Sequence, residues 1–120
     1  MQYKTFQNLS ISRLGMGNMR LPTLPDGKTV DEKKTRALLT YAYEHGVNYF
    51  DTAYSYHGGQ SEPVVSKILR DFPRDTWYLA SKMPGHEINP HFNPKAIFEE
   101  QLRRCQVDYF DFYLLHNVYE

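Results

Sequence analysis

The sequence predicts a protein of the α/β class, built around a parallel sheet. Four segments with the character of strands begin near residues 13, 47, 77 and 109, at intervals of 34, 30 and 32 residues. One helical pattern fills each interval, which is the arrangement of a repeated strand–helix unit. Because crossovers between parallel strands are right-handed, the carboxyl ends of these strands should share one edge of the sheet.

Composition fits one folded domain spanning residues 1–120. The chain is 41% hydrophobic and 15% aromatic, which is enough apolar material for a modest packed core and argues against disorder. Its 14 basic and 14 acidic residues give a net charge of zero, which removes the electrostatic argument for nucleic acid or an anionic membrane. We therefore expect neither as a partner.

The sequence favours a cytoplasmic location. Cys105 is the single cysteine, so an intramolecular disulfide cannot form. The N-terminal segment MQYKTFQNLSISRLG lacks the apolar core of a signal peptide. No run approaches the ~18 apolar residues that a membrane span needs.

A small hairpin opens the chain. Tyr3–Phe6 and Leu9–Ser12 are short alternating segments separated by two residues, which favours two antiparallel strands. A short strand over Arg13–Met16 then runs into a loop whose glycines permit a close approach to a ligand. The loop does not complete a GxGxxG fingerprint, because Arg20 stands where the third glycine should be and Pro22 blocks an immediate helix.

Three helices are predicted from caps and apolar spacing. The first opens with a capping box at Thr29 and Glu32, runs to about His45, and ends at Gly46. The second is capped by Ser61, has Glu62 in its first turn, and carries an apolar stripe up to the breaker Pro73. The third has Asn93 as cap and Pro94 as first residue, with an apolar face over Phe98, Leu102 and Cys105.

The remaining strands are predicted at 47–51, 77–81 and 109–115, and each is followed or ended by a polar residue. These residues are Asp51, Lys82 and His116, which should converge at the carboxyl edge of the sheet. Tyr56 lies five residues beyond Asp51, on the adjoining loop. The sequence therefore predicts an acid, an amine, an imidazole and a phenol close together at the carboxyl edge of the sheet.

These four groups suit proton transfer to a carbonyl oxygen. A phenol with its ordinary pKa of about 10 is a poor acid at neutral pH unless a nearby cation stabilises the phenolate. Lys82 can supply that cation, Asp51 can hold Lys82 by an ion pair, and His116 can hydrogen-bond the substrate oxygen. Tyr56 would then be the general acid. No side chain delivers hydride, so a reduction requires a cofactor.

Each residue alone has a plainer interpretation. Asp51 at a strand end can simply accept hydrogen bonds from loop amides, and Lys82 can be a solvated charge. Tyr56 is one of ten tyrosines, most of which serve packing, and His116 can be a satisfied, partly buried histidine. Their convergence at one sheet edge is what favours a functional site.

Other candidates are weaker. His86 and His91 resemble a metalloprotease motif only loosely, because they are five residues apart and Pro90 interrupts the helix, so no metal site is predicted. Cys105 has the spacing of a core residue and no motif around it, which favours packing over nucleophilic chemistry. His57 should shape the loop and lies close enough to Tyr56 to touch a substrate.

Four separated motifs, LGMGNMRLP, DTAYSYHGGQSE, LASKMP and DYFDFYLLH, resemble the aldo-keto reductase family, in the family's order and over essentially the whole chain. The resemblance implies a (β/α)8 TIM barrel whose bottom is closed by an N-terminal hairpin, with NADPH-dependent reduction of aldehydes or ketones. NADPH is not distinguished from NADH. The family's catalytic Asp, Tyr, Lys and His fall on Asp51, Tyr56, Lys82 and His116.

The resemblance also implies cofactor contacts near the nicotinamide, which fall on Gly17, Asn18, Met19, Arg20 and Asp51. The residues of these motifs most resemble those of a bacterial subgroup that often carries a C-terminal iron–sulfur segment. This chain has one cysteine and no such segment, so no cluster is expected.

The chain departs from the family in length. A barrel of this kind takes about 250 residues and eight strands, whereas this sequence stops at Glu120, just past the fourth strand. We expect the N-terminal half of a reductase barrel, whose open strand edges pair with the missing half or with another copy. The alternative is a non-catalytic half-barrel that acts as a binding, regulatory or self-associating module. The substrate is not identified.

Overall fold

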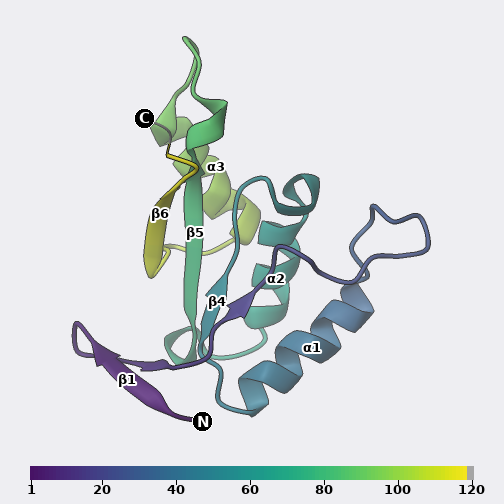
Figure 1. Cartoon of the computed structure of the whole chain (residues 1–120), viewed down its shortest axis with the longest axis vertical. Helices are drawn as coiled ribbons and strands as arrows, with labels where there is room; N and C mark the ends of the chain where they lie inside the picture. Colours follow the sequence, from purple (N-terminus) through teal and green to yellow (C-terminus); the bar gives the residue numbers. More distant parts are fainter. Residues whose placement is uncertain (119–120) are drawn as a thin grey trace.

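A computed structural model describes residues 1–118 and contains a four-stranded parallel sheet, as predicted. The strand order follows the chain, β3-β4-β5-β6 (Figure 1). The strands are β3 (Met16–Gly17), β4 (Tyr49–Asp51), β5 (Tyr78–Pro84) and β6 (Phe112–His116). Asp51 pairs with Ala80, and His116 pairs with Pro84, so the carboxyl ends of the strands share one edge.

The hairpin is also confirmed, with β1 at Tyr3–Phe6 and β2 at Leu9–Ser12. Gln7 and Asn8 form its two-residue turn, both with positive φ, which is the backbone twist that suits such a turn. In Figure 1 the hairpin lies at the end of the sheet where β5 begins. The Phe6 ring lies 5.9 Å from the Phe112 ring, which joins the hairpin to β6.

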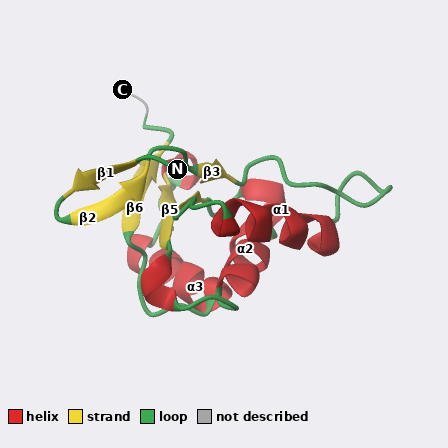
Figure 2. Cartoon of the chain, turned by 90° about the horizontal axis from the view of Figure 1, so that it is seen from below, coloured by secondary structure: helices red, strands yellow, loops and turns green. Residues whose placement is uncertain are grey.

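Three helices pack along one side of the sheet (Figure 2). They are α1 (Glu32–Glu44), α2 (Ser61–Leu69) and α3 (Pro94–Cys105), and three short 3₁₀ turns accompany them, η1 (Tyr56–Gly59), η2 (Arg74–Thr76) and η3 (Gly85–Glu87). The third helix begins as predicted, because the Asn93 side chain accepts a hydrogen bond from the Ala96 amide. The first ends as predicted, with Gly46 at a φ of 93° just after the cap His45.

The capping box predicted for α1 is wrong. Asp31 is the cap, and its carboxylate accepts from the Lys34 amide at 3.0 Å. Thr29 is held elsewhere, because its amide and hydroxyl both bond to the Asp26 carboxylate in the preceding turn. These hydrogen bonds lower the pKa of Asp26, the Thr29 hydroxyl contributing most.

The cap predicted for α2 is wrong as well. Ser61 is the first helical residue rather than the cap, and its hydroxyl lies 2.8 Å from the Thr52 hydroxyl. It also donates to the Asn18 carbonyl at 3.1 Å. Ser61 therefore joins α2 to the loops after β3 and β4, and the helix ends at Leu69, before Pro73.

Strand bounds differ from the predicted ranges by a few residues. The segment before β6 shows why. The Asp111 carboxylate accepts a hydrogen bond from the Leu79 amide at 2.8 Å, so a side-chain oxygen replaces the main-chain carbonyl that a regular strand pair would use. Regular pairing therefore begins at Phe112 rather than at Tyr109. Near β3, the Arg13 amide donates to the Gln2 carbonyl at 2.8 Å, which keeps Arg13 with the hairpin.

The core lies between the helices and one face of the sheet. Its fully buried members include Leu39, Phe50, Ile68 and Leu79. Cys105 belongs to this core, as predicted, and burial raises the pKa of its thiol to about 12, which leaves it unreactive at neutral pH.

The opposite face of the sheet carries a different set of side chains. Because neighbouring residues of a strand point to opposite faces, Tyr49 and Asp51 lie on the face away from the buried Phe50. Tyr49 lies 5.3 Å from Phe112 between ring centroids. On the outer strand β6, Leu114 is 45% exposed. This face and the edges of β3 and β6 correspond to the open side expected of a partial barrel.

Candidate active site

The carboxyl edge of the sheet brings Asp51, Lys82 and His116 together, as the strand pattern predicted. Asp51 is the last residue of β4 and His116 the last of β6. Lys82 was predicted to end its strand at residues 77–81, but β5 continues to Pro84, so Lys82 lies within the strand, opposite Leu114. Tyr56 begins the 3₁₀ turn η1, five residues beyond Asp51. Four side chains from four elements therefore meet at one end of the strands.

Lys82 and Asp51 form a close ion pair. The Lys82 Nζ donates to both Asp51 carboxylate oxygens, at 2.8 and 2.9 Å, and to the Thr52 carbonyl at 2.7 Å. The Lys82 side chain is only 13% exposed, and that of Asp51 is 29% exposed. A cation screened from water in this way is fixed in position and acts more strongly on its neighbours.

Tyr56 lies between this cation and His116. The Lys82 Nζ is 4.7 Å from the centroid of the Tyr56 ring, and the His116 ring meets that ring edge-on at 5.7 Å. Within residues 1–118, no hydrogen bond joins the Tyr56 hydroxyl to Lys82 or to His116. The Tyr56 ring therefore lies beside a cation and an imidazole, and its hydroxyl is hydrogen-bonded to neither.

His116 is held as a neutral imidazole at neutral pH. Burial lowers its pKa below the ordinary value of 6.5, and electrostatic interactions with Lys82 and His86 lower it further, against an opposing effect of Asp51. Its Nδ1 is buried without a hydrogen-bond partner among the described residues. A neutral imidazole has one donor and one acceptor nitrogen, so it can donate a hydrogen bond to a substrate oxygen.

A cavity of about 360 Å³ opens beside Tyr56 and His116. Met19, Ser55, His57, His86 and Asn117 form the rest of its lining. The sequence pointed to Met19 and His57 here, but it missed Ser55, His86 and Asn117. The one sequence feature that could have identified these three residues is their position, since each follows the carboxyl end of a strand by a few residues.

The loop after β3 supports Asp51. Asn18 is fully buried, and its amide nitrogen Nδ2 donates to the Asp51 carbonyl at 2.9 Å and to the Met16 carbonyl at 3.2 Å. Met19, by contrast, is 58% exposed and lines the cavity. The cofactor contacts expected for Gly17, Asn18, Met19 and Arg20 stay predictions. The observed hydrogen bonds of Asn18 fix the end of β4.

His57 fixes the turn that carries Tyr56. Its backbone is left-handed, with a φ of 53°, and its Nε2 accepts a hydrogen bond from the Leu21 amide at 2.8 Å. The neighbouring Gln60 side chain accepts from the Val30 amide at 2.9 Å. The turn is therefore tied to the long loop before α1, which orients Tyr56 toward Lys82.

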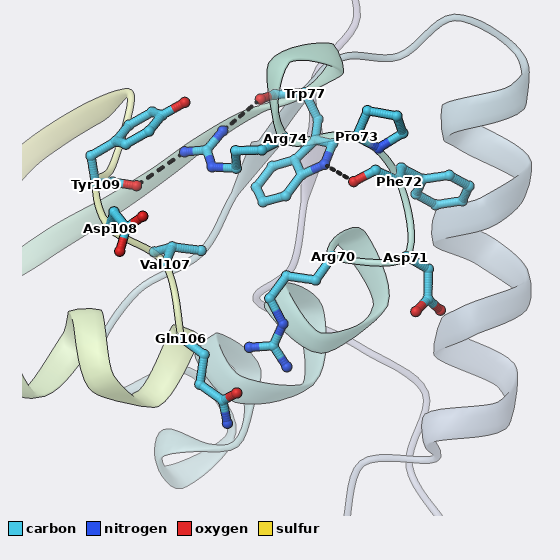
Figure 3. Close-up of a pocket in the computed structure, with 10 residues that line it drawn as sticks. All are labelled: Arg70, Asp71, Phe72, Pro73, Arg74, Trp77, Gln106, Val107, Asp108 and Tyr109. Carbon is cyan, nitrogen blue, oxygen red and sulfur yellow. Dashed lines mark hydrogen bonds between the residues drawn. The ribbon is translucent and has the colours of Figure 1, made fainter.

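A larger cavity, of about 500 Å³, lies at the opposite end of the strands (Figure 3). Its lining includes Arg74, whose guanidinium stacks on the Trp77 and Tyr109 rings at 4.2 and 4.1 Å and donates to the main-chain carbonyls of both residues. It also pairs with Asp111 at 2.9 Å. Because Arg74 is committed to these contacts, we assign this cavity a structural role and take the smaller cavity as the candidate site.

The family model described as the aldo/keto reductase family matches residues 13–120. The chain belongs to the aldo/keto reductase family. The aldo-keto reductase YhdN of Bacillus subtilis is 33% identical to it over 126 aligned residues, which cover 97% of this chain and 38% of YhdN.

Solved aldo-keto reductases share its fold. The holo form of AKR11C1 from Bacillus halodurans is 33% identical, with a TM-score of 0.74, over 96% of this chain and 40% of that one. A reductase from Klebsiella pneumoniae in complex with NADPH is 28% identical, with a TM-score of 0.80, over 100% and 41%. These relatives are (β/α)8 barrels, so the predicted fold class is confirmed as part of such a barrel. This chain spans about two fifths of the length of the reductases it matches.

Within residues 1–118, no group of three or more His, Cys, Asp or Glu side chains is arranged to hold a metal ion. In the same residues, no helix is long and apolar enough to cross a membrane.

Proposed function

We propose that this chain is the catalytic N-terminal half of an NADPH-dependent carbonyl reductase, with Asp51, Tyr56, Lys82 and His116 as its catalytic residues. The observation that carries the proposal is the position of the Lys82 ammonium, bonded to Asp51 at 2.8 Å and 4.7 Å from the Tyr56 ring. A cation at that distance favours the phenolate that remains after Tyr56 gives up its proton.

The residues present suit a nicotinamide cofactor. The cavity beside Tyr56 is lined by proton and hydrogen-bond donors, yet the side chains around it include no source of hydride. When bound, NADPH supplies the hydride that the carbonyl carbon accepts. Gly17, Asn18, Met19, Arg20 and Asp51 are the residues of this chain that we propose to hold it near the nicotinamide.

Proton transfer falls to this chain's own side chains. The Tyr56 hydroxyl donates its proton to the carbonyl oxygen, so that the product is an alcohol. The neutral His116 donates a hydrogen bond to the same oxygen and orients it toward Tyr56. Lys82 stabilises the negative charge left on Tyr56, and Asp51 holds Lys82 in place.

The open sheet suggests how such a site is completed. Among the described strands, β3 and β6 are the outer ones, and Leu114 and Leu115 of β6 are 45% and 57% exposed. We propose that these edges pair with the strands of a complementary half-barrel, or of a second copy, which would supply the remaining cofactor and substrate contacts.

The same open edges favour a second candidate, a non-catalytic half-barrel that acts as a binding or self-associating module. Titration of the 120-residue chain with NADPH, followed by cofactor fluorescence and by consumption of an aldehyde, separates the two. Binding with turnover supports the reductase. Binding without turnover, or neither, supports the module, and sedimentation analysis then shows whether the chain self-associates.

A further inference from the structure

A buried glutamine lies directly behind Lys82. Gln101 belongs to α3 and is fully buried. Its Nε2 donates to the Lys82 carbonyl at 2.9 Å and to the Glu62 carboxylate at 3.0 Å. Moving a polar amide from water into the core costs free energy that its hydrogen bonds must offset. We therefore expect this side chain to have a specific role.

The position of Lys82 in the sheet explains why a donor is needed there. Strand β4 ends at Asp51, opposite Ala80, and the last bond on that side runs from the Thr52 amide to the Ala80 carbonyl at 2.9 Å. The Lys82 carbonyl comes two residues later on the same side of β5, where no strand residue remains to pair with it. The Gln101 side chain supplies the missing donor.

The neighbours of Gln101 fix which way its amide points. The Tyr113 hydroxyl of β6 donates to its Oε1, which leaves Nε2 to face Glu62 and Lys82. The Glu62 carboxylate accepts from Ser81 at 2.8 Å and from Arg104 at 3.2 Å. The network therefore joins α2, α3, β5 and β6 around one carbonyl.

We propose that Gln101 is a positioning residue for Lys82. It holds the main chain of β5 beyond the end of β4, so that the Lys82 side chain reaches Asp51 and the Tyr56 ring together. Its consequence for carbonyl reduction rests on the proposed function above, but its effect on the position of Lys82 does not. The two can therefore be tested apart.

The test measures the reactivity of the Lys82 amine directly. The full 120-residue chain is labelled with trace acetic anhydride, and mass spectrometry gives the labelling of Lys82 relative to the exposed Lys34. Gln101→Met keeps the size of the side chain and removes both polar atoms of its amide. The labelling ratio should then rise about five- to tenfold, the change expected from the loss of roughly one hydrogen bond. The pH dependence of reduction should shift in the same variant.

Cys105→Ala is the matched control, because Cys105 is buried one turn further along α3 and its thiol donates to the Glu62 main-chain carbonyl rather than to the Glu62 carboxylate or Lys82. It should destabilise the chain and leave the labelling ratio unchanged. An unchanged ratio in folded Gln101→Met overturns the proposal, as does an equal rise in the control.

Tyr113→Phe is the milder second variant and carries the test if Gln101→Met does not fold. It frees Oε1 and lets the amide rotate, so the ratio should rise about twofold. No rise in Tyr113→Phe overturns the proposal. A changed ratio in a chain that never reduces a carbonyl supports the positioning role and counts against the proposed function.

Discussion

The Lys82 ammonium lies 2.8 and 2.9 Å from the two carboxylate oxygens of Asp51, although helix α2 separates the two residues in the chain. This pair links β4 to β5 and places a cation beside Tyr56. In Asp51→Asn the amide group would present a donor to the ammonium. We expect the free energy of unfolding to fall by about 1–3 kcal/mol and kcat/KM by about tenfold or more.

Urea unfolding and NADPH consumption check this prediction. Asp31→Asn is the matched control, because asparagine caps a helix as well as aspartate does, so α1 should lose less than about 0.5 kcal/mol. Equal effects of the two substitutions would mean that the ion pair with Lys82 contributes no more to stability or activity than an ordinary helix cap.

Replacing Tyr56 by phenylalanine removes the proposed acid and keeps its ring against Lys82 and His116. We expect the rate of carbonyl reduction to fall by about 10²–10⁴-fold with little change in thermal stability. Stopped-flow measurement of NADPH oxidation gives the rate, and Tyr54→Phe is the control. Tyr54 bonds to Glu100 at 3.2 Å and should be dispensable for the reaction. Full activity in Tyr56→Phe would remove Tyr56 from the mechanism.

The parallel sheet and the grouping of Asp51, Lys82 and His116 were predictable from the sequence. They follow from strand spacing and from a polar residue at or near the end of each strand, which are local signals repeated at a regular interval. Tyr56 was placed with them because it lies only five residues beyond Asp51, on the adjoining loop.

The network around Glu62 was not predictable. In the sequence Glu62 is an acid in the first turn of a helix, which suits the helix dipole and suggests exposure. In the structure it is fully buried and bonded to Arg104 and Gln101, some forty residues later. Burial raises its pKa, against the lowering effect of these hydrogen bonds. Pairings between helices leave no periodic trace in the sequence, so only the packed chain reveals them.

Acid should destabilise the chain through His116. Its pKa is lower in the folded chain than its ordinary value of 6.5, so the unfolded chain binds more protons as pH falls below about 6.5. Its contribution to stability is present above that pH and is lost as pH falls through the folded pKa. The difference in unfolding free energy between the wild type and His116→Gln, measured from pH 7.5 to 5, should therefore decline with acid. Other titrating groups cancel in this difference, and a flat difference would contradict the assignment.

We expect Arg74 to stabilise the fold at the end of the sheet away from the candidate active site; its surroundings are shown in Figure 3. Its guanidinium bonds to the Trp77 and Tyr109 carbonyls and to Asp111, and a lysine cannot reproduce this fork. We expect Arg74→Lys to lower the free energy of unfolding by about 1–3 kcal/mol without changing KM for the carbonyl substrate. Arg36→Lys is the control, since its ion pair with Asp71 is 40% and 60% exposed and should be worth less than about 1 kcal/mol.

Gly85 should tolerate no side chain, because a Cβ there would clash with the His116 carbonyl oxygen, which belongs to the main chain and cannot rotate away. Gly85→Ala must push β5 and β6 apart where His116 joins the active site. We expect a loss of about 1–3 kcal/mol in unfolding free energy, together with slower carbonyl reduction. Gly17→Ala is the matched substitution for stability, because nothing lies within 4 Å of the Cβ it would add. If thermal denaturation finds both alanine variants equally stable, the close approach of Gly85 to His116 does not exist in solution.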